Sequence, residues 1–331
     1  MEKVILDPYG RKRDLIFTPE DLARLNSLAE IVWGKDDPIP EDEIEACREE
    51  IGAIICGSWR YGDVTRFPRL RAILEVGGGL PSPRSLDYDT CSRRIRVLSC
   101  APAFAPAVAE MGLAMALAGC RQLVETAEAF RVGTENWSHE EFGGAFLLHH
   151  KPVGIIGFGN LGRHLKRLLE PFQCPIEVYD PWLTDTYLKT LGVRPVPLET
   201  LLETSRFIFV LAKPTTANKA LLDRALLERI RPDAVFILLS RAHVVDFDAL
   251  TELVLAKRFR AAIDVFPTEP FAPDHPIRQA PYAILSSHRA GAHGEALLNI
   301  GRIVVNDLEA ILNGLPPQEM QPAQPELIPF R

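Results

Sequence analysis

The loop at residues 157–162 has glycines at its first, third and sixth positions. The apolar run Val153–Ile156 before it predicts a buried strand, and the residues after it predict a helix. In such a loop the first glycine permits a tight turn, the second lets the backbone approach a diphosphate, and the third lets helix and strand pack closely. The helix N-terminus adds free N–H groups and a positive dipole end. We therefore expect this loop to bind a dinucleotide through Gly157, Gly159, Asn160, Leu161 and Gly162.

An acidic residue follows at the expected distance. Asp180 comes after the strand-like run Ile176–Tyr179, 18 residues beyond Gly162. A carboxylate at this position accepts hydrogen bonds from the adenosine ribose 2′-hydroxyl and repels a 2′-phosphate, so the motif predicts NAD rather than NADP. The alternative for Asp180 taken alone is a surface helix cap before Pro181.

Strand-like and helix-like segments alternate along the whole chain, which indicates parallel sheets covered by helices. Early in the chain, Thr18 is expected to cap a helix that has Pro19 at its first position. A closing helix is expected at 294–313, followed by an irregular proline-rich arm at 314–331 that docks on the body through Leu327, Ile328 and Phe330. Strands are expected at 4–6, 53–56, 72–76, 153–156, 176–179, 207–211, 235–239, 261–264 and 284–286.

Three later stretches carry a resemblance to a known family. They read LLSRAHVVDFDAL at 238–250, AAIDVFPTEP at 261–270 and ILSSHRAGA at 284–292. In this order behind a nucleotide fingerprint, they resemble the D-isomer-specific 2-hydroxyacid dehydrogenases. The resemblance implies an α/β fold of two domains, a Rossmann-type NAD-binding domain and a flavodoxin-like substrate-binding domain. We expect the NAD-binding domain at 104–294, and the substrate-binding domain at 1–103 and 295–331.

The same resemblance implies a catalytic triad of Arg241, Glu269 and His288. A guanidinium suits the carboxylate and carbonyl oxygens of a 2-keto acid. An imidazole can give a proton to the carbonyl oxygen as hydride reaches carbon, and a carboxylate bonded to that imidazole fixes its tautomer. Taken singly, these residues would be read as a surface ion pair, a solvated turn and an ordinary polar side chain. His293 is a rival for the general acid.

Further site residues are implied by the resemblance alone. The substrate carboxylate is expected on the backbone of Gly77, Gly78 and Gly79, together with Arg241. Asp264 is expected to contact the nicotinamide amide, with a strand-end cap as the alternative. The remaining positions expected around the cofactor are Ala212, Pro214, Asn218, Leu239 and Ser240.

The chain departs from the family pattern at two positions. Ala242 stands where glycine usually follows the catalytic arginine, which leaves the backbone of that loop open. Ser287 stands where proline usually precedes the catalytic histidine, so the presentation of the ring is in question. Glu269 argues against formate dehydrogenases, which place Gln there.

Composition narrows the class of protein. The formal net charge of −7 gives no reason to expect nucleic acid or an anionic membrane as partner. The six cysteines are scattered and predict reduced, buried thiols, and no His or Cys cluster predicts a metal site.

The longest apolar stretch, 101–120, is interrupted by Pro102, Pro106 and Glu110. We expect a cytoplasmic homodimer with the apolar helix 104–121 at its contact.

The expected activity is NAD-dependent oxidoreduction at the CH–OH group of a small 2-hydroxy acid, with glyoxylate or hydroxypyruvate reduction as the best match. Two alternatives stay open from the sequence. One is an NAD(H)-sensing regulatory protein of the same fold without turnover, and the other is a related oxidoreductase such as a phosphite dehydrogenase. The side chain of the substrate and the physiological direction do not follow from the sequence.

Overall fold

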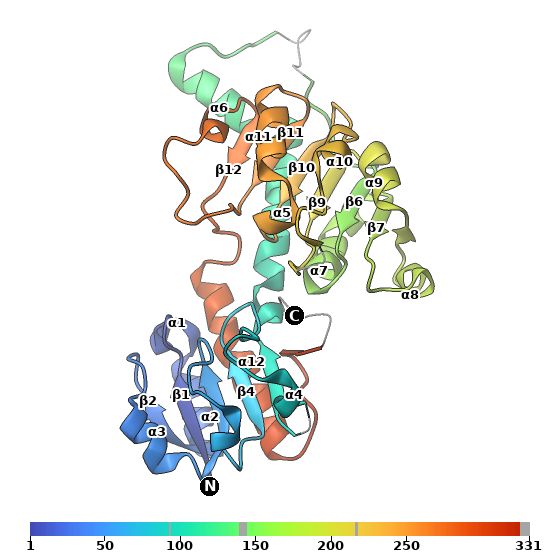
Figure 1. The fold of residues 1–331 in the computed structure, drawn as a ribbon. Helices are drawn as coiled ribbons and strands as arrows, with labels where there is room; N and C mark the ends of the chain where they lie inside the picture. The colour runs from blue at the N-terminus through green and yellow to red at the C-terminus, as the bar shows by residue number, and fades with distance from the viewer. Residues whose placement is uncertain (93, 139–143, 216–217, 325–331) are drawn as a thin grey trace. The chain divides into compact units, whose positions relative to one another are not determined.

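The computed structural model describes residues 1–92, 94–138, 144–215 and 218–324 (Figure 1). The chain divides into two compact units. Unit 1 consists of Met1–Ala105 and Gly291–Arg331, and unit 2 is Pro106–Ala290. The breaks fall beside the crossovers expected near residues 103 and 294, and the first break lies within helix α5 (Ala101–Arg121).

Unit 1 is built on a six-stranded sheet of order β13-β5-β4-β3-β1-β2. All its neighbouring strands run parallel except β13, which pairs antiparallel with β5. The five parallel strands have the order 2-1-3-4-5 of a flavodoxin-like sheet, as predicted. The strands are β1 (Glu2–Asp7), β2 (Ala29–Gly34), β3 (Ile51–Cys56), β4 (Ala72–Glu75), β5 (Arg96–Ser99) and β13 (Gln321–Pro322).

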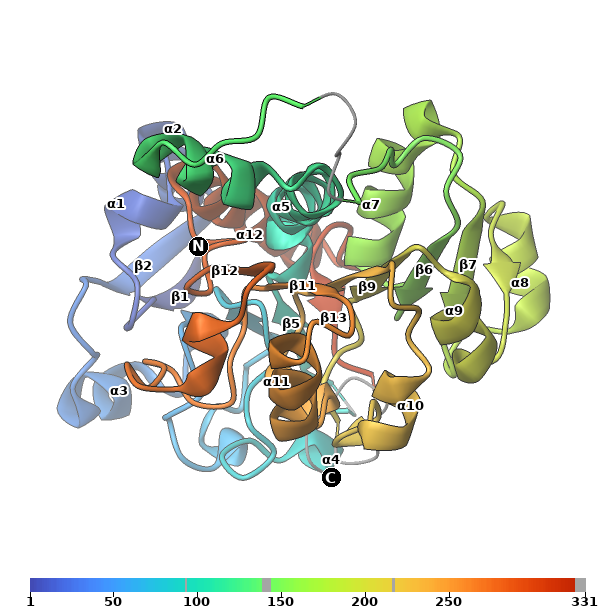
Figure 2. The same cartoon turned by 90° about the horizontal axis from the view of Figure 1, so that it is seen from above.

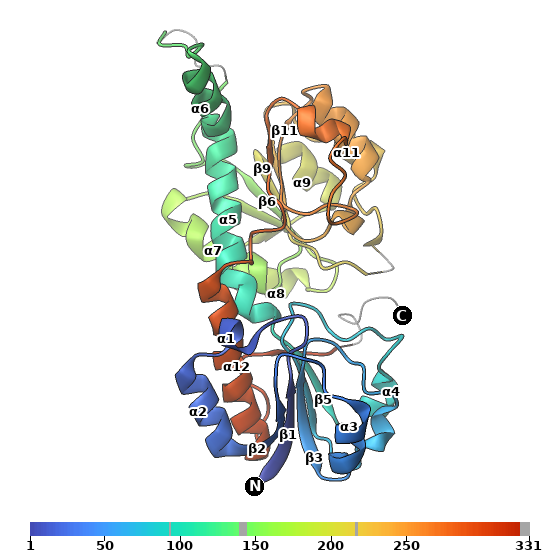
Figure 3. The same cartoon turned by 90° about the vertical axis from the view of Figure 1, so that its left-hand side faces the viewer.

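Helices cover both faces of this sheet, as Figure 3 shows. Alternate residues of a strand point to opposite faces, so Val4 and Leu6 pack with one group of helices while Ile5 faces the other. The first face is covered by α1 (Arg13–Ile16), α2 (Pro19–Leu28) and α12 (Gly294–Leu312), and the second by α3 (Glu41–Cys47) and α4 (Tyr88–Cys91).

The start of α2 follows the sequence prediction. The Thr18 side chain accepts a hydrogen bond from the Asp21 N–H at 3.0 Å, and the Asp21 carboxylate accepts one from the Thr18 N–H at 3.1 Å. Pro19 stands at the first helical position. This reciprocal pair satisfies two N–H groups that a helix start otherwise leaves free.

The prediction that the C-terminal arm is irregular is wrong, because part of the arm forms strand β13. Gln321 pairs with Ser99 at the edge of the sheet. The fully buried carboxylate of Asp307, on α12, accepts hydrogen bonds from the N–H groups of Gln318, Glu319 and Met320 and so holds the arm in place. Leu327, Ile328 and Phe330 lie outside the described residues.

Unit 2 contains a seven-stranded sheet of order β12-β11-β10-β9-β6-β7-β8, with every pair parallel. Numbered within the unit, its strands follow the order 3-2-1-4-5-6 of a Rossmann-type sheet with one strand added. Figure 2 shows β9, β6 and β7 in succession, with α8 beyond β7. The strands are β6 (Val153–Ile156), β7 (Ile176–Tyr179), β8 (Arg194–Pro195), β9 (Phe207–Val210), β10 (Val235–Leu238), β11 (Arg260–Ile263) and β12 (Ala283–Leu285).

The core of unit 2 lies between the sheet and its helices. The strand residues of β6, β9 and β10 are all buried, as expected for a parallel sheet covered on both faces. Besides α5, the helices are α6 (Leu123–Val132), α7 (Asn160–Leu169), α8 (Asp185–Thr190), α9 (Leu198–Thr204), α10 (Arg224–Glu228) and α11 (Phe247–Leu255).

Helix α5 continues through Pro106 as one helix of 21 residues. Within the described part of the chain it is the one helix with the length and apolar composition to cross a membrane. However, 56% of that window is buried within the protein. A buried core helix has the same composition, so this is weak evidence for a membrane span.

Candidate active site

The glycine loop joins β6 to α7, and each glycine has a distinct reason to be there. Gly157 has a φ of +89°, and a Cβ built on it would lie 2.6 Å from the Cα of Ala212. A Cβ on Gly162 would lie 3.0 Å from the carbonyl oxygen of Gly157. At Gly159, by contrast, a Cβ meets nothing within 4 Å. The turn and the helix contact thus exclude side chains, while the middle glycine borders open space at the N-terminus of α7, where a diphosphate fits.

Asp180 lies at the end of β7, the neighbour of β6, and is half-buried. One carboxylate oxygen accepts a hydrogen bond from the Phe158 N–H at 2.7 Å, and the other accepts one from the Trp182 N–H at 2.9 Å. The next helix, α8, is capped by Thr184 instead. Asp180 is therefore tied to the glycine loop and is no helix cap. A carboxylate has about four acceptor positions, so two remain for a ribose hydroxyl.

The candidate acid–base pair is in direct contact. The Nδ1 atom of His288 lies 2.6 Å from Oε2 of Glu269, and Oε1 of Glu269 accepts a hydrogen bond from the Phe266 N–H at 3.0 Å. Both side chains remain more than a third exposed. Burial acts to raise the pKa of Glu269, but the hydrogen bonds from His288 and Phe266 and nearby positive charge outweigh it, so this pKa lies below its usual range. Glu269 is thus ionised and fixed.

Arg241 joins this pair from the neighbouring strand. It follows β10, while Glu269 and His288 follow β11 and β12, and parallel strands end at one edge of the sheet. Its guanidinium is close enough to contribute to the lowered pKa of Glu269. Nη1 of Arg241 donates to the Ser240 carbonyl at 2.6 Å. The residue is exposed, but burial of its guanidinium lowers the pKa of Arg241, while the charge of Glu269 acts to raise it. The structure therefore brings the three predicted catalytic residues to one edge of unit 2.

Asp264 holds the segment that carries His288. Its carboxylate has no exposed surface and accepts hydrogen bonds from the N–H groups of Arg289 at 2.8 Å and Ala290 at 3.1 Å. Its carbonyl accepts one from the His288 N–H at 2.8 Å. His288 itself has a φ of +54°, an uncommon conformation for a residue with a side chain. These hydrogen bonds agree with the strand-end cap that the sequence left open as the alternative for Asp264, and the segment that Asp264 caps is the one that carries His288.

The other predicted cofactor residues lie in two loops at the same edge. Oδ1 of Asn218 accepts from the Thr215 N–H and its Nδ2 donates to the Lys213 carbonyl, both at 2.7 Å, so Asn218 shapes the loop after β9. Leu239 is buried, and the buried hydroxyl of Ser240 has no hydrogen-bond partner among the described residues. The remaining two, in the loop after β9, are Ala212 and Pro214.

The two departures from the family pattern have different consequences. Ala242 is buried at the start of a short 3₁₀ turn, Ala242–Val244, and does not have a positive φ, so glycine is not required there. Ser287 is exposed, immediately before the positive φ of His288.

Gly77, Gly78 and Gly79 lie in unit 1, in the loop after β4. The carbonyl of Gly77 accepts a hydrogen bond from the Cys100 N–H at 2.9 Å, which ties this loop to the end of β5. His293 also belongs to unit 1, where it precedes α12, and among the described residues its exposed side chain forms no ion pair with a carboxylate. Within the described residues, no carboxylate contact like that between Glu269 and His288 supports His293 as the general acid.

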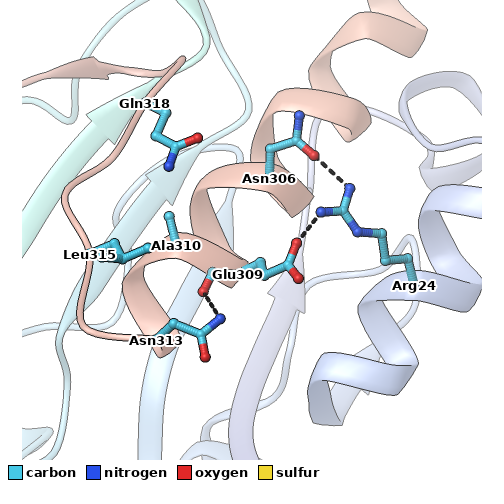
Figure 4. A pocket seen from close by; sticks show the side chains of 7 residues that line it. All are labelled: Arg24, Asn306, Glu309, Ala310, Asn313, Leu315 and Gln318. Carbon is cyan, nitrogen blue, oxygen red and sulfur yellow. Dashed lines mark hydrogen bonds and ion pairs between the residues drawn. The ribbon is translucent and has the colours of Figure 1, made fainter.

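A polar pocket on unit 1 is formed by α2, α12 and the segment after α12 (Figure 4). Arg24 is its central cation, and it is hydrogen-bonded to Asn306 and ion-paired with Glu309. The side-chain amide of Asn313 donates to the Glu309 carbonyl. These contacts join α2 to α12 and give the polar side chains of the pocket a structural role.

Comparison with known proteins identifies the NAD-binding part of the chain. The family model described as "D-isomer specific 2-hydroxyacid dehydrogenase, NAD binding domain" matches residues 113–290. The crystal structure of a phosphoglycerate oxidoreductase from Rhizobium etli is 37% identical, covers 98% of this chain and 99% of that one, and has a TM-score of 0.84. The predictions of the family, the two-domain α/β fold and NAD as cofactor are confirmed.

Two curated relatives show the spread of the similarity. D-3-phosphoglycerate dehydrogenase of Mycobacterium tuberculosis is 27% identical over 301 residues, covering 89% of this chain and 55% of that protein. Glyoxylate/hydroxypyruvate reductase B of Pectobacterium atrosepticum is 30% identical over 254 residues, covering 75% of this chain and 77% of that protein. The chain thus spans about half the length of the first of these relatives. Because the family model matches more than half of the chain, the chain belongs to the D-isomer specific 2-hydroxyacid dehydrogenase family.

Proposed function

We propose that this protein is an NAD-dependent oxidoreductase that interconverts a small 2-keto acid and the corresponding D-2-hydroxy acid. The observation that carries the proposal is the contact between Glu269 and His288 at the strand-end edge of the NAD-binding unit, with Arg241 beside it. A sensor that only binds a dinucleotide has no need of a carboxylate-paired imidazole at this edge.

His288 is the proposed general acid and base. Because Glu269 accepts the hydrogen on Nδ1, Nε2 is the ring nitrogen left to exchange a proton with the substrate oxygen. In keto acid reduction Nε2 gives its proton to the carbonyl oxygen, and in hydroxy acid oxidation it takes that proton back. The ionised carboxylate of Glu269 favours the imidazolium that forms in the second case.

Arg241 is the proposed anchor of the substrate. Its planar guanidinium can donate two parallel hydrogen bonds to the substrate carboxylate and remains charged at any working pH. Its exposed side chain leaves these donors accessible. In unit 1, the family resemblance assigns the backbone N–H groups of Gly77, Gly78 and Gly79 to substrate carboxylate binding.

The cofactor is held by the edge of the unit 2 sheet. We assign the diphosphate to the loop 157–162 and the adenosine ribose to Asp180. Bound there, NAD supplies or accepts the hydride. Since Asp264 is fully buried and engaged by backbone N–H groups, any contact it makes with the nicotinamide amide uses its remaining acceptor positions. The other proposed contacts are Ala212, Pro214, Asn218, Leu239 and Ser240.

We further propose that the substrate is a short acid, a narrower class than the 2-hydroxy acids that define the family. The relatives named above are a phosphoglycerate oxidoreductase, a D-3-phosphoglycerate dehydrogenase and a glyoxylate/hydroxypyruvate reductase. All three names describe short acids of two or three carbons, and we propose an acid of this size, with hydroxypyruvate and glyoxylate as first candidates.

We also propose that the protein is a cytoplasmic homodimer. Helix α6, which follows the apolar helix 104–121, has no buried residue. Its Leu123, Phe130 and Val132, and Trp137 after it, are each more than 60% exposed. An apolar surface of this kind is typical of a contact between subunits. Light scattering of the purified protein, and of a Phe130→Glu variant, measures this directly.

The activity is tested by mixing the purified protein with NADH and a panel of 2-keto acids and following NADH absorbance. We expect at least one short 2-keto acid to be reduced, with D-2-hydroxy acid as product. Binding of NADH without reduction of any acid would contradict the proposal and favour a sensor. A parallel reaction with NAD and phosphite tests the remaining alternative, a phosphite dehydrogenase. Formation of NADH with phosphite, without reduction of any 2-keto acid, would favour that alternative.

A further inference from the structure

The loop after β1, residues 8–12, is fixed at the strand-end edge of the unit 1 sheet. The Arg11 N–H donates to the Pro8 carbonyl at 2.9 Å, which closes a turn. A Cβ built on Gly57, directly after β3, would lie 2.0 Å from the Tyr9 carbonyl oxygen. Glycine at 57 therefore lets this loop pack against the end of the neighbouring strand, and the position of Arg11 is set by backbone contacts.

Phe104 connects Arg11 with the proposed substrate loop. The guanidinium carbon of Arg11 lies 5.6 Å from the centre of the Phe104 ring. The same ring lies 3.5 Å from a Cβ built on Gly78. Arg11 and the loop of Gly77–Gly79 thus contact one aromatic ring, all within unit 1.

Arg11 differs from the other arginines at this edge in its lack of an acidic partner. Arg13 is paired with Asp36, and Arg60 with the buried Asp7. Across the described ranges of the chain, Arg11 forms no ion pair. Burial lowers the pKa of its guanidinium, and the nearby Cys100 thiol acts in the opposite direction. A partly desolvated guanidinium without a counter-charge is costly, and an anion bound from outside offsets that cost.

We propose that Arg11 binds a second anionic group, a carboxylate or phosphate on the side chain of the 2-keto acid whose own carboxylate is held at Gly77–Gly79. The inference rests on the proposed function and names the substrate class of the same site. A guanidinium presents a planar fork of donors that matches both carboxylate and phosphate, and Phe104 holds that fork beside the loop. Arg11 is therefore a specificity residue for dianionic acids.

The test uses two matched pairs of substrates that differ in one anionic group. Hydroxypyruvate is compared with 3-phosphohydroxypyruvate, and 2-ketobutyrate with oxaloacetate, so that the two pairs distinguish a phosphate from a carboxylate. The variants are Arg11→Met, which keeps an apolar stem on Phe104, Arg11→Lys, which keeps the charge, and Lys12→Met as the control on the same loop. Melting temperatures show that each variant is folded.

We expect the wild type to have the lower KM for the dianionic member of at least one pair. Arg11→Met should raise that KM about 10- to 100-fold, the range of a charge-assisted hydrogen bond, and leave the monoanionic KM unchanged. Arg11→Lys should recover part of the loss, and Lys12→Met should change neither KM by more than about twofold.

Two results would overturn the inference while the proposed function stands. One is a wild type that is active but shows no preference for either dianionic acid. The other is an Arg11→Met variant whose KM values for both members of a pair change equally or not at all. A wild type that reduces none of the four acids but does reduce glyoxylate would overturn this inference alone. A wild type that reduces no short 2-keto acid, glyoxylate included, would overturn the proposed function and this inference with it.

Discussion

The Nδ1 atom of His288 lies 2.6 Å from Oε2 of Glu269, although 19 residues separate them in the chain. The second oxygen of Glu269 accepts from the Phe266 N–H, and the His288 N–H donates to the Asp264 carbonyl. Backbone contacts thus fix both members of the pair. This arrangement leaves Nε2 of the imidazole for the substrate.

Replacing His288 by alanine should reduce kcat about 10²- to 10⁴-fold, the usual contribution of general acid–base catalysis. The affinity for NADH should stay within about twofold, because the loop 157–162 and Asp180 are untouched. Steady-state rates and NADH fluorescence titration measure the two quantities. His293→Ala is the matched control and should retain activity. The assignment is wrong if His293→Ala is the inactive variant.

Replacing Glu269 by glutamine should make stability depend less on pH. The pKa of Glu269 is lowered in the folded protein, so its ionised form stabilises the fold at pH above its unfolded value, and this contribution is lost as the pH falls through the lowered pKa. The wild type should therefore be more stable than Glu269→Gln at neutral pH, by a small amount because the pair is partly exposed.

The measurement is urea unfolding of both proteins from neutral pH down through the acidic range. The difference in unfolding free energy should shrink as the pH falls. A difference that stays constant over that range would mean that the charge of Glu269 is not responsible.

Nine of the strands and the glycine loop could be predicted because their signals are local, whereas β2, β5 and β8 were not among the expected strands. Val153–Ile156 is a continuous apolar run, and the turn that follows requires a φ that Gly157 adopts easily. The positions of Arg241, Glu269 and His288 at one sheet edge also followed, since parallel strands place their C-terminal ends together.

Features that depend on distant contacts could not be predicted. The strand Gln321–Pro322 has only two residues, and it forms because Asp307 holds the preceding segment and β5 offers a free edge. The role of Asp264 in fixing the loop of His288 depends on backbone N–H groups 25 and 26 residues later. Neither contact leaves a periodic pattern in the sequence.

Replacing Arg241 by lysine should raise the KM for 2-keto acids at least about tenfold, because an ammonium group cannot donate two parallel hydrogen bonds from one plane. The affinity for NADH should be unchanged. Initial rates over a range of keto acid concentrations, at saturating NADH, separate the two effects. An unchanged KM would show that the carboxylate is bound elsewhere.

Replacing Asp180 by asparagine should relax the preference for NAD over NADP. The change removes the negative charge that repels a 2′-phosphate and keeps one oxygen as an acceptor for the Phe158 or Trp182 N–H. The ratio of kcat/KM for the two reduced cofactors is the relevant quantity. Asp185→Asn, a change of the same charge at the start of α8, serves as the control. The same ratio in both variants would contradict the assignment of the ribose to Asp180.

Gly157→Ala should lower the stability of the protein, whereas Gly159→Ala should weaken NADH binding and leave stability nearly unchanged. At Gly157 a methyl group would meet the Ala212 backbone at 2.6 Å in a left-handed conformation, so unfolding free energy should fall by about 2–5 kcal/mol. At Gly159 a methyl group meets no protein atom within 4 Å, so stability should hardly change. If the diphosphate lies against Gly159, that methyl group occupies its place, and Gly159→Ala should weaken NADH binding at least about tenfold. Thermal unfolding and NADH titration of both variants provide the comparison. A Gly159→Ala protein that is stable and binds NADH normally would mean that the diphosphate lies away from this loop.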